Sequence, residues 1–445
     1  MTPTVLYQTI FKRKSIRKYR MEGLPQSSID AIDTAIQQVK LLDNSIRTEI
    51  KLFSQDAVKG FLAIKSPHYL LFFSEKKKGY LENAGFILQQ LDLALSAMGL
   101  GTCWLGMAKP TSQFEGESVF PFVIALSVGI PEETLHRGGA EEFKRKTRQL
   151  ICPTPYHAEI IEAARLAPSA TNSQPWQFRT TEKAVHVYRM NTGLLKAWLY
   201  DRLNGIDMGI ALCHLWLAAT AKEFQVQFIH DLEAAEGHPI GAHYTLTMLL
   251  EPVHKFDPRH KAVLKDAWRQ RNLPAQDVLK AMGLKSHDIV ADVGCGTGYF
   301  SMAAAEIIYS EGTVYALDTS EEMLQETDKT MADHQRNKVV TMRTDNYDFK
   351  LPDASVTYVW MANVLHEVAD RQEFLMEANR ILPPGGRLAL LEWDKKETPE
   401  GPPLHHRISL EEARTLLDMT GFRIVSEKSF AAHFYGMVAE KRSSQ

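Results

Sequence analysis

The spacing of apolar and polar residues changes character near residue 252. Beyond that point short apolar runs alternate with amphipathic stretches of helical period, which is typical of a parallel sheet covered by helices. We predict strands at 288–295, 312–318, 338–345, 356–364 and 386–394, helices at 260–284, 299–308, 321–334, 371–382 and 411–421, and a closing antiparallel pair at 422–430 and 433–441.

Before the boundary the chain carries a weak internal repeat. The segment 90–101 can be laid on 214–225, and the segment 29–39 on 158–168, with short apolar strands at 69–73 and 185–189 between them. This pattern predicts two copies of one α+β unit, each with a long buried helix. The alternative is the ordinary likeness of helices that are rich in Ala and Leu.

A chain of 445 residues is too long for one compact core, so we predict a multidomain protein. The first part, 1–252, is an α+β region with halves of about 1–150 and 151–252, and the second part, 253–445, is an α/β domain.

The charge balance and the cysteines limit the partners of the protein. Lys and Arg number 51 against 54 Asp and Glu, so there is no basic field for nucleic acid or for an anionic membrane. Lys12 precedes any long apolar run, and we expect neither a signal peptide nor a spanning helix. Four cysteines without a CxxC pair predict no disulfide scaffold, no metal site and a cytoplasmic location. We therefore expect small-molecule substrates.

Two basic segments in the first half could bind a phosphate. Six of the nine residues 12–20 are basic, and the alternation of Arg13, Ser15 and Arg17 could aim two guanidinium groups and a hydroxyl at one anion. Lys144 and Arg145 belong to a second basic cluster that could close the same site. The alternative for both segments is a solvated charged face.

Two further segments suit a flat heterocycle. The glycines of 99–106 leave backbone groups free for close approach to a ligand. The segment 167–176, APSATNSQPW, offers small polar side chains and one Asn, whose amide both donates and accepts hydrogen bonds. A capped helix end followed by a strand is the structural alternative for the second segment.

Residues 8–250 resemble the nitroreductase family of flavoproteins through RKSIRKY, GLGTCWLG and EAARLAPSATNSQPWQF. Family members are usually homodimers with FMN between the subunits. Here the first half lacks NSQPW and the second half lacks the basic segment, so the resemblance implies a fused pseudo-dimer with one FMN site and NAD(P)H as reductant. The implied FMN-binding residues are Arg13, Ser15, Arg17, Gly101, Thr102, Cys103, Trp104, Gly106, Lys144, Arg145, Pro168, Ser169 and Asn172.

The second part contains a glycine-rich turn between a predicted strand and helix. Gly294, Gly296 and Gly298 form a GxGxG pattern, and Asp292 precedes them on the strand, where an acidic side chain suits a cationic ligand. Asp318 ends the next strand and could bind ribose hydroxyls. The pair Asp345 and Asn346, after the third strand, could bind an adenine amino group. Helix capping is the alternative for either aspartate alone.

Residues 256–445 resemble class I S-adenosylmethionine (SAM) dependent methyltransferases with a Rossmann-like fold, through DVGCGTG, ALDTSEEML, NVLHEV and LPPGGRLALLEW. The resemblance is strongest to enzymes of small molecules such as quinone precursors. A base could assist methyl transfer. The candidate catalytic residues are His366, Glu367 and Glu392, with His405 and His406 as further candidates.

Together these observations predict a bifunctional enzyme, an FMN-dependent NAD(P)H oxidoreductase fused to a SAM-dependent small-molecule methyltransferase. The alternative is a methyltransferase whose N-terminal region binds flavin or substrate without catalysis. The sequence leaves the methyl acceptor, the electron acceptor and the oligomeric state open.

Overall fold

The computed structural model describes residues 1–60, 64–114, 116–191, 194–253, 256, 259, 264, 267–308, 312–334, 338–398 and 400–443, apart from the side chains of 194–200 and 333–334. The chain divides into two compact units, Met1–Glu251 and Pro252–Gln445, each of which is described by itself. The first half of the helical prediction at 260–284 lies largely outside the described residues.

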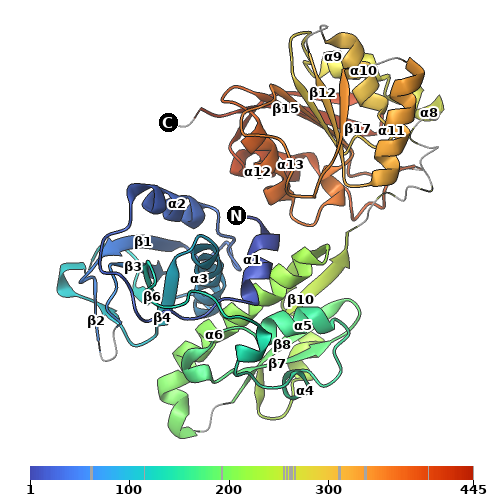
Figure 1. Ribbon diagram of the computed structural model, residues 1–445. Helices are drawn as coiled ribbons and strands as arrows, with labels where there is room; N and C mark the ends of the chain where they lie inside the picture. Colours follow the sequence, from blue (N-terminus) through green and yellow to red (C-terminus); the bar gives the residue numbers. More distant parts are fainter. Residues whose placement is uncertain are drawn as a thin grey trace. The chain divides into compact units, whose positions relative to one another are not determined.

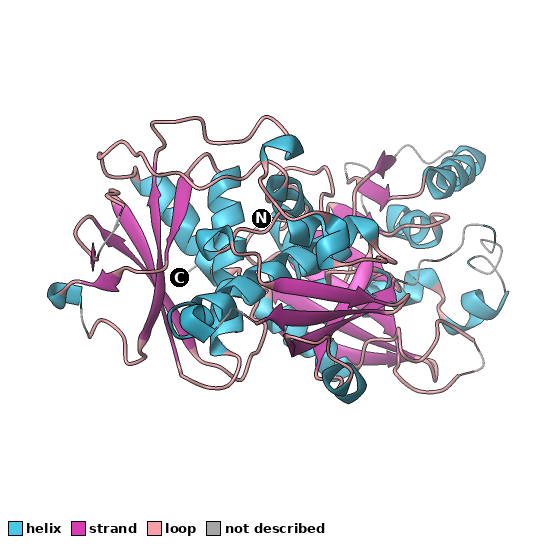
Figure 2. Ribbon diagram, turned by 90° about the horizontal axis from the view of Figure 1, so that it is seen from below, coloured by secondary structure: helices cyan, strands magenta, loops and turns pink. Residues whose placement is uncertain are grey.

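The first unit contains two four-stranded antiparallel sheets, and helices lie beside the strands (Figures 1 and 2). The strand orders are β1-β3-β6-β4 and β7-β8-β10-β9. In the first half the elements are α1 (Pro3–Ile10), α2 (Gln26–Gln37), β1 (Thr48–Ser54), β2 (Val58–Lys59), β3 (His68–Ser74), α3 (Tyr80–Ala97), β4 (Gly101–Leu105), β5 (Lys109–Pro110), β6 (Phe122–Gly129) and α4 (Arg148–Ile151). The second half contains α5 (Ala158–Arg165), β7 (Trp176–Thr180), β8 (Ala184–Met190), α6 (Leu194–Ala221), β9 (Phe224–Ile229), α7 (Leu232–Glu236) and β10 (Ala242–Pro252).

The predicted internal repeat is confirmed by these sheets. In each half the first, second, fourth and third main strands stand side by side, and the long helix α3 or α6 connects the second strand to the third. The segments that were aligned from sequence, 90–101 and 214–225, form the same helix end and turn in the two halves.

The two long helices cross at a pair of glycines. A Cβ atom on Gly85 of α3 would come within 2.9 Å of the carbonyl carbon of Ile206 in α6. A Cβ atom on Gly209 of α6 would come within 2.8 Å of the carbonyl carbon of Glu82 in α3. Each contact is the counterpart of the other under an offset of 124 residues, since 85 + 124 = 209 and 82 + 124 = 206. The local two-fold relation between the halves therefore passes through this crossing.

The second unit has one seven-stranded sheet of order β13-β12-β11-β14-β15-β17-β16. The first five of these strands pair in parallel, and β17 and β16 are antiparallel, as predicted. The elements are α8 (Ala267–Asn272), α9 (Ala275–Ala281), β11 (Val290–Val293), α10 (Tyr299–Ile307), β12 (Val314–Asp318), α11 (Glu321–His334), β13 (Val339–Arg343), β14 (Tyr358–Ala362), α12 (Arg371–Ile381), β15 (Arg387–Trp393), α13 (Leu410–Met419), β16 (Phe422–Phe430) and β17 (Phe434–Lys441).

Local sequence signals account for several of these boundaries. All four residues of β11 are buried, as in strands covered on both faces. Asp370 caps α12 by accepting the N–H of Glu373, and Ser409 and Glu412 form a reciprocal capping box at α13. Among the described residues, no helix combines the length and the apolar character that a bilayer span requires.

Candidate functional sites

A cavity of about 1020 Å³ opens at the carboxyl ends of the central strands of the second unit. The turn after β11 borders it with Gly294 and Gly296. Gly294, Gly296 and Gly298 all have positive φ angles, of 72°, 56° and 77°, which side chains other than glycine adopt with strain. Ligands of open α/β sheets bind at this edge, where the strand order reverses between β11 and β14.

Two acidic side chains lie beneath the glycine turn. Asp318 accepts the N–H of Gly296 at 2.9 Å and the N–H of Ser320 at 2.8 Å. Asp292, which is 3% exposed, accepts the hydroxyl of Ser301 at 2.5 Å. Burial, reinforced by the charge of Asp318, raises the pKa of Asp292 to about 7, and burial also raises the pKa of Asp318. Two carboxyl groups in this setting favour a cationic ligand.

The next predicted pair also borders the cavity, but its aspartate is engaged elsewhere. Asp345 and Asn346 follow β13 and line the cavity. The carboxylate of Asp345 is 76% exposed and forms an ion pair with Lys350 at 3.0 Å. An adenine contact from this carboxylate would have to compete with the lysine.

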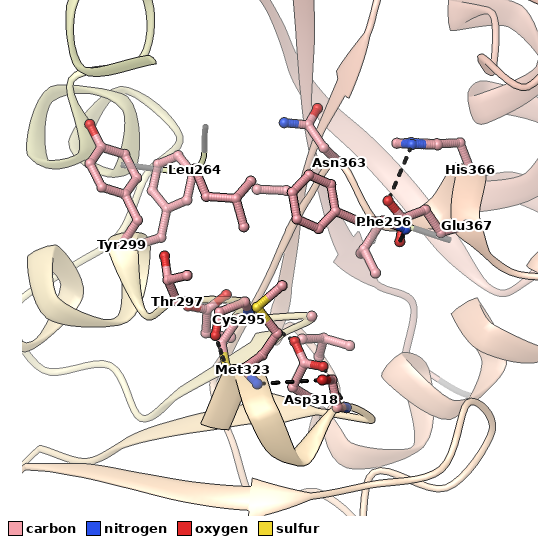
Figure 3. A pocket seen from close by; sticks show the side chains of 18 of the residues that line it. Phe256, Leu264, Cys295, Thr297, Tyr299, Asp318, Met323, Asn363, His366 and Glu367 are labelled. Atoms are coloured by element: carbon pink, nitrogen blue, oxygen red, sulfur yellow. Dashed lines mark hydrogen bonds and ion pairs between the residues drawn. The ribbon is translucent and has the colours of Figure 1, made fainter. Parts of the chain in front are cut away.

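A buried acid and base pair lies on the opposite side of the cavity (Figure 3). His366 and Glu367 follow β14, and the Nδ1 atom of His366 lies 2.8 Å from Oε2 of Glu392, which is fully buried. Burial alone would lower the pKa of His366, but the charge of Glu392 outweighs it and raises that pKa. Burial raises the pKa of Glu367 to about 7, and its Oε1 lies 3.7 Å from Nε2 of His366.

The prediction of Glu392 as a catalytic base is corrected by its position. Among the described residues that line the cavity, His366 and Glu367 are present and Glu392 is not. Both oxygens of Glu392 are turned to His366, to its backbone N–H at 3.3 Å and to its ring. Glu392 is thus a positioning residue. His405 and His406 do not border the cavity within the described part of the chain.

In the first unit the predicted basic segments come together, and Arg137 joins them. The pKa of Arg145 is lowered to about 10. The main cause is burial, and the positive charges of Arg13, Arg137 and Arg165 add to it. The guanidinium groups of Arg137 and Arg145 lie 4.1 and 5.7 Å from the ring centre of Phe143. Such a concentration of half-buried positive charge fits an anionic group. Sequence reasoning missed Arg137, because a single arginine in a loop carries no pattern.

Arg13 has a different role from the predicted one. Its side chain is 3% exposed and pairs with the buried Asp92 of α3 at 2.6 Å, while it also donates to the hydroxyl of Ser15 at 3.1 Å. A phosphate would therefore meet a guanidinium that is already paired. Arg17 is exposed, and its charge acts on the thiol of Cys103, so it lies at the same site.

The second half contributes Asn172, which contacts the first half directly. Asn172 Oδ1 accepts a hydrogen bond from Arg145 at 2.7 Å, and its amide donates to the carbonyl of Lys144 at 2.9 Å. Its φ angle is 59°, so the segment around it is strained. The preceding Pro168 is buried, and the hydroxyl of Ser169 accepts the N–H of Gln174 at 2.9 Å.

A buried carboxyl of α6 supports this strained segment. Asp207 accepts the N–H of Ala170 at 3.0 Å, and burial raises its pKa to about 7. Its counterpart in α3 is Asn83, at the same offset of 124 residues, which accepts the N–H of Leu42 at 2.9 Å. Sequence reasoning missed Asp207, which is one of two acids, with Asp201, in a largely apolar helix.

The glycine-rich segment packs differently from the expectation. A Cβ on Gly101 would meet the side chain of Ile16 at 2.8 Å, and one on Gly106 would meet Leu203 at 3.0 Å. At these two positions a Cβ atom would collide with a neighbouring side chain, so the close packing of Ile16 and Leu203 requires glycine. Between them, Thr102 donates to the buried Asp92, the thiol of Cys103 is buried, and Trp104 is half-buried.

Comparisons with known proteins agree with this division. Residues 5–219 match the family model described as "Putative TM nitroreductase", and residues 291–390 match the one described as "Methyltransferase domain". Relatives include the demethylmenaquinone methyltransferases of Geobacillus sp. strain WCH70, 29% identical over 144 residues, and of Listeria monocytogenes serotype 4a, 32% identical over 124. The matches cover 32% and 28% of this chain, and 61% and 52% of those proteins.

Solved structures show likeness to each unit. A SAM dependent methyltransferase from Aquifex aeolicus is 30% identical, with a TM-score of 0.41, and the match covers 42% of this chain and 98% of that one. A putative nitroreductase from Thermotoga maritima is 23% identical, with a TM-score of 0.37, over 56% of this chain and 93% of that one. The matches to the two family models thus identify a nitroreductase-like domain followed by a methyltransferase domain.

Proposed function

We propose that the second unit transfers a methyl group from SAM to a small molecule. The observation that carries this proposal is the pair of acids beneath the glycine turn, the buried Asp292 and the half-buried Asp318, in the same cavity as Glu367. When bound, SAM supplies an electrophilic methyl group on a positively charged sulfur. Asp318 binds the ribose hydroxyls, because each of its oxygens keeps a second lone pair after accepting one backbone N–H. Asp292 favours the positive charge.

Glu367 acts as the general base in this proposal. A carboxyl group with a pKa of about 7 is half-ionised at neutral pH and can both take up and release a proton. His366, oriented by Glu392, lies beside it and stabilises the ionised form. The chain supplies orientation and one proton acceptor, which suits a displacement whose rate depends on alignment.

The cofactor assignment is tested by calorimetric titration of SAM. Asp318→Ala weakens SAM binding at least about tenfold, because two charge-assisted hydrogen bonds to the ribose disappear. Asp353→Ala is the matched control, since this aspartate is exposed, pairs with Arg380 and does not line the described cavity, and His366→Ala also leaves SAM binding intact. An unchanged affinity in Asp318→Ala contradicts the assignment.

We propose that the first unit binds one FMN per chain and oxidises NAD(P)H. The support is the cluster of arginines at the junction of the halves, where Arg145 contacts Asn172. Arg17, Arg137 and Arg145 would hold the phosphate, and Arg13, paired with Asp92, would orient the hydroxyl of Ser15. When bound, FMN supplies an acceptor for hydride. Lys144, Thr102, Cys103, Trp104, Pro168 and Ser169 remain proposed neighbours of the flavin.

The flavin proposal is tested by the visible absorbance of protein that has been incubated with FMN and then dialysed. We expect about one FMN per chain, weaker retention in Arg17→Ala and Arg145→Gln, and normal retention in Arg148→Gln, an exposed arginine of the same basic segment. A protein that ignores FMN refutes the proposal. FMN binding without NAD(P)H oxidation favours the non-catalytic alternative.

Both activities on one chain suggest consecutive reduction and methylation of one metabolite. Competition assays test this idea. If the two units share a substrate, a substrate of one unit competitively inhibits the activity of the other. Two unrelated sets of substrates refute the idea. The four cysteines are buried and unpaired, in keeping with the cytoplasmic location that we propose.

A further inference from the structure

The methyl acceptor end of the cavity has an aromatic wall. Trp268 of α8, Trp393 at the end of β15 and Phe434 at the start of β17 all line it. The ring centres of Trp393 and Phe434 lie 4.3 Å apart, and Trp268 is almost parallel to Trp393, at 11° and 5.9 Å. Adjacent aromatic faces and edges of this kind bind flat, apolar groups.

The charges around the cavity exclude one class of acceptor. The acidic residues that line it are Asp292, Asp318, Asp345, Glu367 and Glu400, and the basic residues of the described lining are Arg269 and His366. After one acid has met the sulfonium of SAM, the remaining carboxylates still repel an anion. An acceptor that carries carboxylate or phosphate is therefore disfavoured, whereas a neutral one is not.

The outer wall of the cavity is a loop that one buried arginine holds in place. Residues 400–403, on the loop after β15, line the cavity. The side chain of Arg407 is 3% exposed and donates five hydrogen bonds to this loop. Its acceptors are the carbonyls of Asp394, Lys396, Glu400 and Pro402 and the hydroxyl of Thr398. Opening the loop would leave the buried guanidinium group of Arg407 without these acceptors, and an unpaired buried charge costs free energy.

The same loop fixes the central indole of the wall. Gly401 has a φ of 96°, and a Cβ at this position would lie 2.8 Å from the ring of Trp393. The guanidinium of Arg407 lies 5.1 Å from the centre of that ring. Backbone and cation thus hold Trp393 in one position. A wall that is rigid before the ligand arrives loses little entropy on binding and selects for shape.

We propose that this aromatic wall, held by Arg407, makes the methyltransferase unit specific for a neutral, flat hydroxyarene whose hydroxyl group faces Glu367. This inference rests on the proposed methyl transfer and names its substrate class. In the reaction the hydroxyl proton passes to Glu367 while the oxygen forms a bond to the methyl carbon. The carbon–sulfur bond breaks with its electron pair left on sulfur, so the products are a methyl ether and a neutral thioether.

The test uses the full chain, saturated with S-adenosylhomocysteine, and three probes of similar size. These are the neutral hydroxyarene 2-naphthol, its anionic analogue 2-naphthoate and the aliphatic decanol. Binding is measured on this complex by calorimetry and by tryptophan fluorescence. Methyl transfer is measured separately, by radiolabel from SAM, on protein without S-adenosylhomocysteine. We expect 2-naphthol to bind at least about tenfold more tightly than the other two and to accept the label.

Variants separate the wall from the cofactor site. Trp393→Ala and Arg407→Gln each weaken 2-naphthol binding at least about tenfold and leave S-adenosylhomocysteine binding within about twofold, and Trp393→Phe restores part of the loss. Arg414→Gln is the matched control, because Arg414 is an exposed arginine of α13 that pairs with Glu427. Glu367→Gln abolishes label transfer while 2-naphthol still binds.

The results distinguish a failure of the methyl-transfer proposal from a failure of the proposed substrate class. A protein that binds no adenosyl compound refutes the methyltransferase proposal. A protein that binds S-adenosylhomocysteine but not 2-naphthol, or that prefers 2-naphthoate or decanol, overturns only the substrate class. Unchanged 2-naphthol affinity in Trp393→Ala overturns the role of the wall.

Discussion

The crossing of α3 and α6 leads to a sharp prediction for Gly85→Ala and Gly209→Ala. The added methyl groups would overlap the carbonyl oxygens of Ile206 and Glu82 and lie within 2.9 and 2.8 Å of the carbonyl carbons, where ordinary contacts are 3.4–4 Å, so the helices must separate by about one ångström or more. Overpacking of this kind costs about 1–3 kcal/mol. In a unit of this size each kcal/mol lowers the melting temperature by about 2–4 °C, so each variant should melt roughly 2–12 °C lower.

The double variant separates this mechanism from general damage. One outward shift of the helices relieves both clashes, because the two glycines face each other across the same crossing. The double variant should therefore cost less than the sum of the single ones, by about 0.5–3 kcal/mol. Scanning calorimetry measures this, and the transition that moves on addition of S-adenosylhomocysteine marks the second unit as an internal control. Strict additivity, or single variants that melt like the wild type, would refute the reasoning.

Three further predictions concern buried acids. Because Asp292 has a pKa of about 7 and a cation favours its ionised form, calorimetric affinity for SAM should rise with pH through 7, and Asp292→Asn should flatten this rise. Asp207, whose pKa is raised by burial, stabilises the fold below its unfolded pKa and loses that contribution as pH rises through about 7. The melting temperature of Asp207→Asn, measured relative to that of the wild type, should accordingly be higher at pH 8 than at pH 5. The same difference between variant and wild type at both pH values would contradict this. Glu392→Gln should lower the pKa of His366 in an NMR titration, because burial then outweighs the remaining charges, and an unmoved pKa would argue against their coupling.

Much of the second unit could be predicted because its signals are local. The glycine turn, Asp292 and Asp318 lie within one strand, turn, helix and strand that follow one another in the sequence, and short stretches of chain determine that geometry. The role of Glu392 could not be predicted, since it depends on β14 and β15 being neighbours and on which way the carboxylate turns. Arg407 follows two histidines in the sequence and acts only through a loop that folds back over it.

The first unit shows where motifs mislead. The resemblance implied that Arg13 binds a phosphate. In the structure its guanidinium group pairs with the buried carboxylate of Asp92, which lies 79 residues later in the sequence. A glycine at position 101 is expected from the ligand-contact motif, and it is also required because the side chain of Ile16 packs against it. Only the fold reveals the second reason. By contrast, the meeting of Asn172 with Arg145 follows from the complementary halves.

Covalent fusion of the halves has a consequence for how this protein can vary. In a dimer of identical subunits any substitution is made twice, on both sides of the axis at once. Here each side mutates alone. Asn83 and Asp207 occupy equivalent positions, and the amide of one and the carboxyl of the other show that the two sides have already diverged at a supporting position. Substitutions can therefore change one side of the first unit while the other side keeps the unit folded.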